Sequence, residues 1–210
     1  MDVNCREQNI KAIIKLEGRI RLCNRCPALL KCTSNPSFGK GDLEPEAMVV
    51  FEGESIYTQD IDWVVAMRKS IQKYFSVNRI YHTFLVRCQP KACTRGQDIS
   101  CTLNSRLLDH NDICLFTNRP CDGIPVKPSN EEVINCLYFL LEEIEVLKPK
   151  YVFLFGSRVS DFVLKTYGIF EPPAEQQLFE HEATTFISMV GEEAYSNKDF
   201  KKAATFTNKH

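Results

Sequence analysis

The sequence predicts a three-layer α/β domain in which helices cover both faces of a central, mostly parallel sheet of four strands. Two observations support this prediction. Short apolar runs, which suit buried parallel strands, alternate along the chain with longer stretches of helical periodicity. Such alternation places helices in the crossovers between parallel strands. A chain of 210 residues can form one good core, so we expect a single domain over residues 1–210.

Composition restricts the class of protein. The chain is 44% hydrophobic and 25% charged, which is typical of globular proteins, and its net charge is −1. A global basic field for nucleic acid is therefore excluded, whereas a local basic patch stays open. The start of the chain has no signal-peptide pattern, and no apolar run is long enough to span a bilayer. We expect a cytoplasmic monomer that binds no membrane and whose ten cysteines are reduced or bind metal.

The N-terminal part of the chain contains one predicted helix and one predicted strand. An apolar stripe with intervening charges predicts a helix over about 6–22, and Cys23-Asn24-Arg25-Cys26 follows it directly. Turn-forming residues fill 33–42. The apolar run 47–51 then predicts a buried strand, and residues 52–55 form the loop at its carboxyl end.

The middle of the chain continues the pattern and then interrupts it. We expect a helix over 60–75 and a second strand over 79–86. Residues 93–125 are rich in cysteine and lack periodicity, so we expect an insertion or lid there. A long helix then begins at Ser129, which forms a Ser-x-x-Glu capping box with Glu132.

The C-terminal part supplies the last two predicted strands. These are 151–155 and 184–190, with a helix over 159–167 between them and a final polar helix over 197–204. Ligands of parallel α/β sheets bind at the carboxyl ends of the strands. The places to search for chemistry are therefore the loops after residues 51, 86, 155 and 190.

Four cysteines stand out as candidate metal ligands. Cys23 and Cys26 are three positions apart and can turn toward one metal, while Cys88 follows the second strand and Cys136 lies in the long helix. Four thiolates from distant elements suit a 4Fe-4S cluster or, alternatively, a structural zinc. Cys32 is close enough to Cys26 to compete as a ligand.

With these motifs the chain resembles the iron–sulfur (family 4) uracil-DNA glycosylases over about residues 19–165. The matching segments are the cysteine motifs and strand ends: Cys23–Cys26, Gly39-Lys40-Gly41, Glu52-Gly53-Glu54, Arg87-Cys88-Gln89-Pro90, Pro128–Cys136 and Lys148–Ser157. The resemblance implies a uracil-DNA glycosylase-like fold, a 4Fe-4S cluster and DNA as the partner. It also implies a role in DNA repair through hydrolysis of an N-glycosidic bond.

The resemblance implies site residues as well. Gly53 and Glu54 belong to the family's first motif, and Asp60 supplies its further acid, so Glu54 or Asp60 would activate water. For Asp60, a helix N-cap is an alternative role. Trp63 would replace the family's base-stacking aromatic residue, although a core position is the alternative. Phe84 aligns with the asparagine that reads the edge of the base.

Two departures from the family pattern concern catalysis. Phe84 cannot hydrogen-bond a base, and the loop Met189-Val190-Gly191-Glu192 lacks the family's histidine. Losing one donor to the developing negative charge costs about 3 kcal/mol of barrier. The sequence therefore predicts a changed base specificity or little excision. The alternative is a non-catalytic adaptor with a glycosylase fold that binds nucleic acid or a protein partner.

Basic residues near the cysteines are candidate nucleic-acid contacts. Arg25, Arg87 and Lys91 flank the predicted cluster ligands and would bind phosphates, and plain solvation is the alternative. The segment 93–125 is a candidate surface for a protein partner.

Overall fold

The computed structural model describes residues 3–26, 36–88, 91–92 and 127–207, together with residues 111, 113, 118, 120, 124 and 125. Most of the predicted insertion at 93–125 lies outside the described residues, and so does Cys32.

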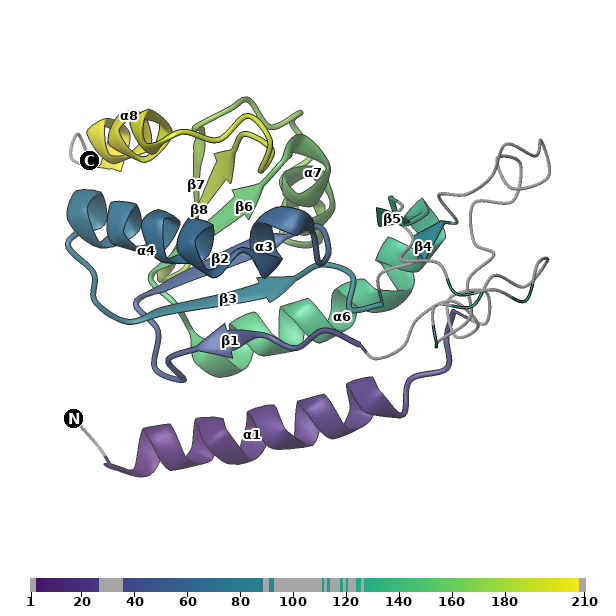
Figure 1. The fold of residues 1–210 in the computed structure, drawn as a ribbon. Helices are drawn as coiled ribbons and strands as arrows, with labels where there is room; N and C mark the ends of the chain where they lie inside the picture. Colours follow the sequence, from purple (N-terminus) through teal and green to yellow (C-terminus); the bar gives the residue numbers. More distant parts are fainter. Residues whose placement is uncertain are drawn as a thin grey trace.

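A six-stranded sheet with the order β1-β3-β2-β6-β8-β7 forms the centre of the fold (Figure 1). Its strands are β1 (Lys40–Gly41), β2 (Ala47–Phe51), β3 (Ile80–Phe84), β6 (Tyr151–Phe155), β7 (Leu178–His181) and β8 (Thr184–Met189). The four inner strands are parallel and are the four predicted ones, whereas β1 and β7 add antiparallel edges. The edges escaped prediction because neither has a continuous apolar run: β1 has two residues and β7 alternates in burial. A separate ribbon pairs β4 (Lys91–Ala92) with β5 (Ile124–Pro125).

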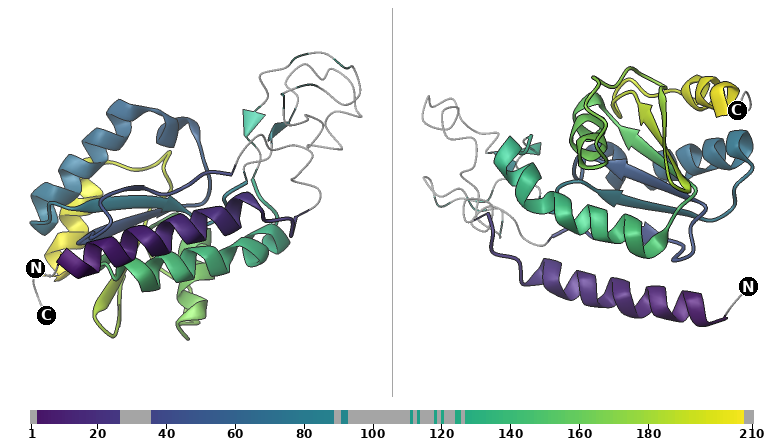
Figure 2. Two further views of the ribbon diagram at one scale, coloured as in Figure 1. Left: turned by 90° about the horizontal axis from the view of Figure 1, so that it is seen from below. Right: turned by 180° about the vertical axis from the view of Figure 1, so that it is seen from behind.

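Helices cover both faces of this sheet, which confirms the three layers (Figures 1 and 2). Their bounds are α1 (Val3–Arg21), α3 (Ile56–Gln59), α4 (Ile61–Phe75), α6 (Asn130–Leu147), α7 (Ser157–Thr166) and α8 (Asn197–Thr207). The amphipathic helices α4 and α8 pack on one face, and α1, α6 and α7 on the other. The short helix α3 was not predicted. In the described parts of the chain, no helix combines the length and hydropathy needed to cross a bilayer.

The interior explains why the strands could be recognised. All five residues of β2 are fully buried, because β2 lies between two parallel partners and under helices on both faces. On the α4 and α8 side the core is rich in aromatic residues. Phe75 and Phe153, for example, meet edge to face with ring centroids 4.8 Å apart. A core of this kind holds the ends of β2, β6 and β8 in fixed positions.

Candidate functional site

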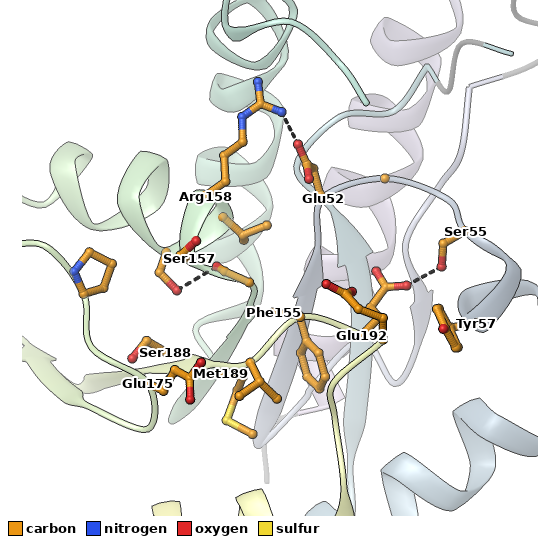
Figure 3. A pocket seen from close by; sticks show the side chains of 18 of the residues that line it. Glu52, Ser55, Tyr57, Phe155, Ser157, Arg158, Glu175, Ser188, Met189 and Glu192 are labelled. Carbon is orange, nitrogen blue, oxygen red and sulfur yellow. Dashed lines mark hydrogen bonds and ion pairs between the residues drawn. The ribbon is translucent and has the colours of Figure 1, made fainter. Parts of the chain in front are cut away.

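A cavity of about 450 Å³ opens at the carboxyl ends of β2, β6 and β8 (Figure 3). The loops that follow these three strands line it, together with Lys127 and Pro128 before α6. Gly156 makes the turn from β6 into α7 with a φ of 92°, a conformation that glycine adopts without strain. The cavity therefore lies at the sheet edge where parallel strands predict ligand binding.

The loop after β2 places Gly53 and Glu54 at this cavity. A capping box fixes the loop: Ser55 Oγ accepts from the backbone N–H of Thr58 at 3.2 Å, and Thr58 Oγ1 accepts from the N–H of Ser55 at 2.8 Å. The Glu54 carboxylate accepts a hydrogen bond from Ser37 Oγ at 3.2 Å. Glu54 is thus held at the cavity wall.

Glu192, in the loop after β8, is the cavity's most perturbed carboxyl group. Its carboxylate accepts a hydrogen bond from Ser55 Oγ, so the two side chains point toward each other across the cavity wall (Figure 3). The pKa of Glu192 is raised to about 7, chiefly by burial. The hydrogen bond from Ser55 opposes this shift, and the charges of Glu193 and Glu52 contribute to it. A carboxyl group that titrates near neutral pH can act as a general acid or base.

Sequence reasoning missed Glu192 as a functional residue. The sequence predicts chemistry in the loop after residue 190, and Glu192 lies in the loop where the resemblance implies a histidine. The signal was its place after the last parallel strand. Its pKa, however, depends on burial and on Ser55 and Glu52 from the loop after β2, which the local sequence does not show.

The charges of the cavity are unbalanced. Five lining residues are glutamates and two are cationic: Glu52, Glu54, Glu175, Glu192 and Glu193 against Lys127 and Arg158. Both cations approach the same glutamate. Arg158 forms an ion pair with Glu52 (Figure 3) and donates to Asn130 Oδ1 at 2.7 Å, and Lys127 Nζ lies 3.9 Å from Glu52. Within the described parts of the chain, neither Glu54 nor Glu192 forms an ion pair.

The structure does not bring Asp60, Trp63 and Phe84 to the cavity. Asp60 is the N-cap of α4 and accepts from the backbone N–H of Asp62 at 2.9 Å, which is the alternative role considered for it. Trp63 packs behind the cavity, with its ring centroid 5.7 Å from that of Tyr57. Tyr57 itself lines the cavity.

Phe84 lies deeper, at the end of β3. It is 2% exposed and its ring centroid lies 6.3 Å from that of Phe51, so it is a core residue. Phe84 therefore packs in the core and does not line the cavity, where the resemblance implies a contact with the base.

Arg87 also differs from its expected role. It is 1% exposed, and its Nη2 donates to Glu143 Oε2 at 2.5 Å. The same carboxylate accepts from Tyr81 Oη at 2.7 Å and Thr83 Oγ1 at 2.5 Å, so this network ties β3 to α6. A surface phosphate contact is therefore replaced by a buried ion pair, because Glu143 on α6 faces the end of β3.

The other two predicted phosphate contacts are Arg25 and Lys91. Arg25 is exposed. Its guanidinium lies over the ring of Tyr138, 4.0 Å from the centroid, and its Nη1 donates to the carbonyl of Asn135 at 3.5 Å. Lys91 is the first residue of β4.

The four predicted cysteine ligands gather at one corner of the molecule. Cys23 follows α1, Cys88 follows β3, and Cys136 lies in the second turn of α6. All of them are free thiols. Burial and the charges of Cys136, Cys23 and Cys26 raise the pKa of Cys88 to about 12, so the four groups interact electrostatically. Cys26 Sγ also accepts a hydrogen bond from Asn135 Nδ2 at 3.8 Å.

Donors around these thiols fit an anionic centre. The backbone N–H of Arg87 donates to Cys136 Sγ at 3.3 Å. Nε and Nη1 of the Arg87 guanidinium are buried and have no hydrogen-bond partner among the described residues, and the charge of this cation acts on Cys136. Buried donors without acceptors are costly unless negative charge lies close by. Among the described residues, however, no three acidic, histidine or cysteine side chains form a closed metal site. The surrounding donors suit a thiolate-ligated cluster, although the four thiols are not arranged as a closed set of ligands.

Comparisons with known proteins agree with this architecture. A family model described as Uracil DNA glycosylase superfamily matches residues 41–206. A comparison with curated proteins found no match. The family match begins at the end of β1, extends into α8 and includes every loop that lines the cavity, whereas Cys23 and Cys26 precede it. Since the match spans well over half of the chain, this protein belongs to the uracil DNA glycosylase superfamily.

Proposed function

We propose that this protein is an iron–sulfur DNA glycosylase-like enzyme. It would bind DNA, admit an extruded nucleotide to the cavity at the ends of β2, β6 and β8, and hydrolyse the N-glycosidic bond. The main support is Glu192, a partly buried carboxyl group with a pKa near 7 at the cavity of a glycosylase-superfamily fold. Enzymes that act on a base must take the base out of the helical stack and hold it in a pocket. The volume of this cavity, about 450 Å³, is within the usual range of small-molecule sites.

The proposed reaction requires little of the protein beyond its carboxylates. Water attacks C1′ of the sugar, the electron pair of the glycosidic bond moves to the base nitrogen, and the proton lost by water passes to Glu192. Glu54 lies in the same cavity and stabilises positive charge that develops on the sugar. The Ser55 hydroxyl orients the Glu192 carboxylate through its hydrogen bond.

The proposal includes a 4Fe-4S cluster on Cys23, Cys26, Cys88 and Cys136, with zinc as the alternative. The donors that surround the thiols support this assignment. The cluster would serve a structural role. It would join the end of α1 to α6 and to the end of β3, and it would leave the exposed Arg25 beside it to contact a phosphate.

An excision assay tests the proposed function. Metal-loaded protein is incubated with end-labelled DNA that carries one non-standard base, and abasic sites are then cleaved with alkali. We expect strand breaks that fall by roughly a hundredfold in Glu192→Gln. They should persist in Glu180→Gln, whose exposed carboxyl on β7 lies outside the cavity. Salt-sensitive DNA binding without breaks would overturn the enzyme proposal in favour of the adaptor.

A further inference from the structure

The charge of the cavity restricts which bases it can release. When a neutral base leaves as an anion, the site must supply donors for the negative charge, and one such donor is worth a hundredfold or more in rate. Both cationic side chains of this cavity already approach Glu52, and Glu54 and Glu192 have no ion-pair partner among the described residues. Carboxylates close to a departing anion would raise its energy. A neutral base such as uracil is therefore a poor leaving group here.

A base that is already positively charged avoids this difficulty. Alkylation of a purine ring nitrogen, as in 7-methylguanine or 3-methyladenine, gives the ring a positive charge, and the base then leaves as a neutral molecule. Carboxylates stabilise such a cation while it is bound and also stabilise the positive sugar in the transition state. Release of such a base requires no hydrogen-bond donor for a departing anion.

An aromatic side chain adds to this preference. Tyr57 lines the cavity and is partly exposed, whereas Phe155, at the end of β6, is 3% exposed and packs against Phe51 in the core (Figure 3). Cations are attracted to the faces of aromatic rings, most strongly where water is excluded. The cavity thus combines one partly exposed aromatic ring with carboxylates, and both kinds of group attract a flat organic cation.

We propose that the cavity selects cationic, N-alkylated purine nucleotides over neutral bases. This inference rests on the proposed function, because it assumes that the cavity receives an extruded nucleotide. The chemistry balances with water alone. The water oxygen bonds to C1′, the C1′–N bond breaks, its electron pair neutralises the charge on the purine, and Glu192 takes the proton.

A release assay tests the selectivity. DNA methylated to carry 7-methylguanine and 3-methyladenine is compared with DNA carrying uracil or hypoxanthine, and free base is measured by chromatography after subtraction of spontaneous depurination. We expect methylated purines to be released at least about tenfold faster than the neutral bases, and Glu192→Gln to lose this release while Glu180→Gln keeps it. Release of uracil or hypoxanthine with methylated purines untouched would overturn the selectivity and leave the proposed function standing. Release of no base would overturn both the selectivity and the proposed catalysis.

A binding measurement separates recognition from catalysis. Trp63 is the single tryptophan of the chain and contacts Tyr57, so its fluorescence reports on the cavity. We expect 7-methylguanosine to quench this fluorescence at concentrations at least about tenfold lower than guanosine, and we expect Glu192→Gln to reduce the difference. Equal affinity for both nucleosides would contradict the selectivity even if the protein excises bases.

Discussion

The Ser55 hydroxyl donates a hydrogen bond to the Glu192 carboxylate, and this contact joins the loop after β2 to the loop after β8. The two residues are 137 positions apart in the chain. They meet because β6 lies between β2 and β8 in the sheet, so that all three strands end at one edge. The loop after β2 thus supplies the hydrogen-bond partner of a carboxyl group that lies in the loop after β8.

Ser55→Ala should change both the pKa of Glu192 and the stability of helix α3, which Ser55 caps. Loss of the hydrogen bond raises the pKa of Glu192 further, because this bond favours the ionised carboxylate. Loss of the α3 N-cap should cost about 1 kcal/mol of unfolding free energy. Urea denaturation measures the stability, and the pH profile of excision should move to higher pH. Ser55→Thr, which keeps a hydroxyl, serves as the control. An unchanged profile in Ser55→Ala would show that the hydrogen bond does not tune Glu192.

Glu192 should make the protein less stable as pH rises from about 4.5 to 7. In the unfolded chain this carboxyl loses its proton near 4.5, whereas its pKa in the folded protein is about 7. The folded state binds more protons between these values, so the free energy of unfolding falls there with rising pH and levels off above 7. Because the carboxyl is only partly buried, we expect Glu192→Gln to be more stable than the parent by about 1–2 kcal/mol at pH 8 and similar at pH 4.

Urea denaturation across this pH range measures the effect. Glu180→Gln is the matched control, because its carboxyl is exposed and lies outside the cavity. If Glu192→Gln kept the same pH dependence as the parent, the raised pKa would be contradicted.

Loss of the buried ion pair between Arg87 and Glu143 should lower the free energy of unfolding far more than loss of a neighbouring surface ion pair. Arg87→Met leaves Glu143 charged and buried, which should cost roughly 3–5 kcal/mol. One position earlier on α6, Glu142 pairs with Arg19, and both side chains are partly exposed. Glu142→Gln should therefore cost less than about 1 kcal/mol. Denaturant titrations of both variants give the comparison, and equal losses would show that Arg87 is not buried in solution.

The cysteine corner gives a test that does not depend on excision. Protein purified without oxygen should be brown and carry about four irons per chain. Cys136→Ser should lose the colour and most of the iron, because it removes a ligand from α6. Cys5→Ser should lose neither, since Cys5 is exposed on α1. Colourless parent protein that holds zinc would favour the alternative metal, and metal-free parent protein would contradict a metal centre.

Much of the framework follows from local sequence. Strands β2 and β6 could be recognised because a strand buried on both faces is largely apolar, and that run is visible without knowledge of its partners. The start of α6 could be recognised because the capping box between Ser129 and Glu132 spans only three positions. Knowledge that parallel strands end at one edge then indicated where Gly53 and Glu54 would lie.

The roles of individual side chains were decided by tertiary structure. Arg87 and Arg25 are equally basic in the sequence, yet Arg87 is buried because Glu143 on α6 faces it, while Arg25 remains exposed. The resemblance implies a base-reading position for Phe84, yet Phe84 lies in the core with buried residues of α4. The sequence alone therefore established the four inner strands, the longer helices and the sheet edge that carries the site, because periodicity and capping depend on near neighbours. Only the folded chain could bring Glu192 to Ser55, because the pKa and partner of a side chain depend on groups that the sheet order places beside it.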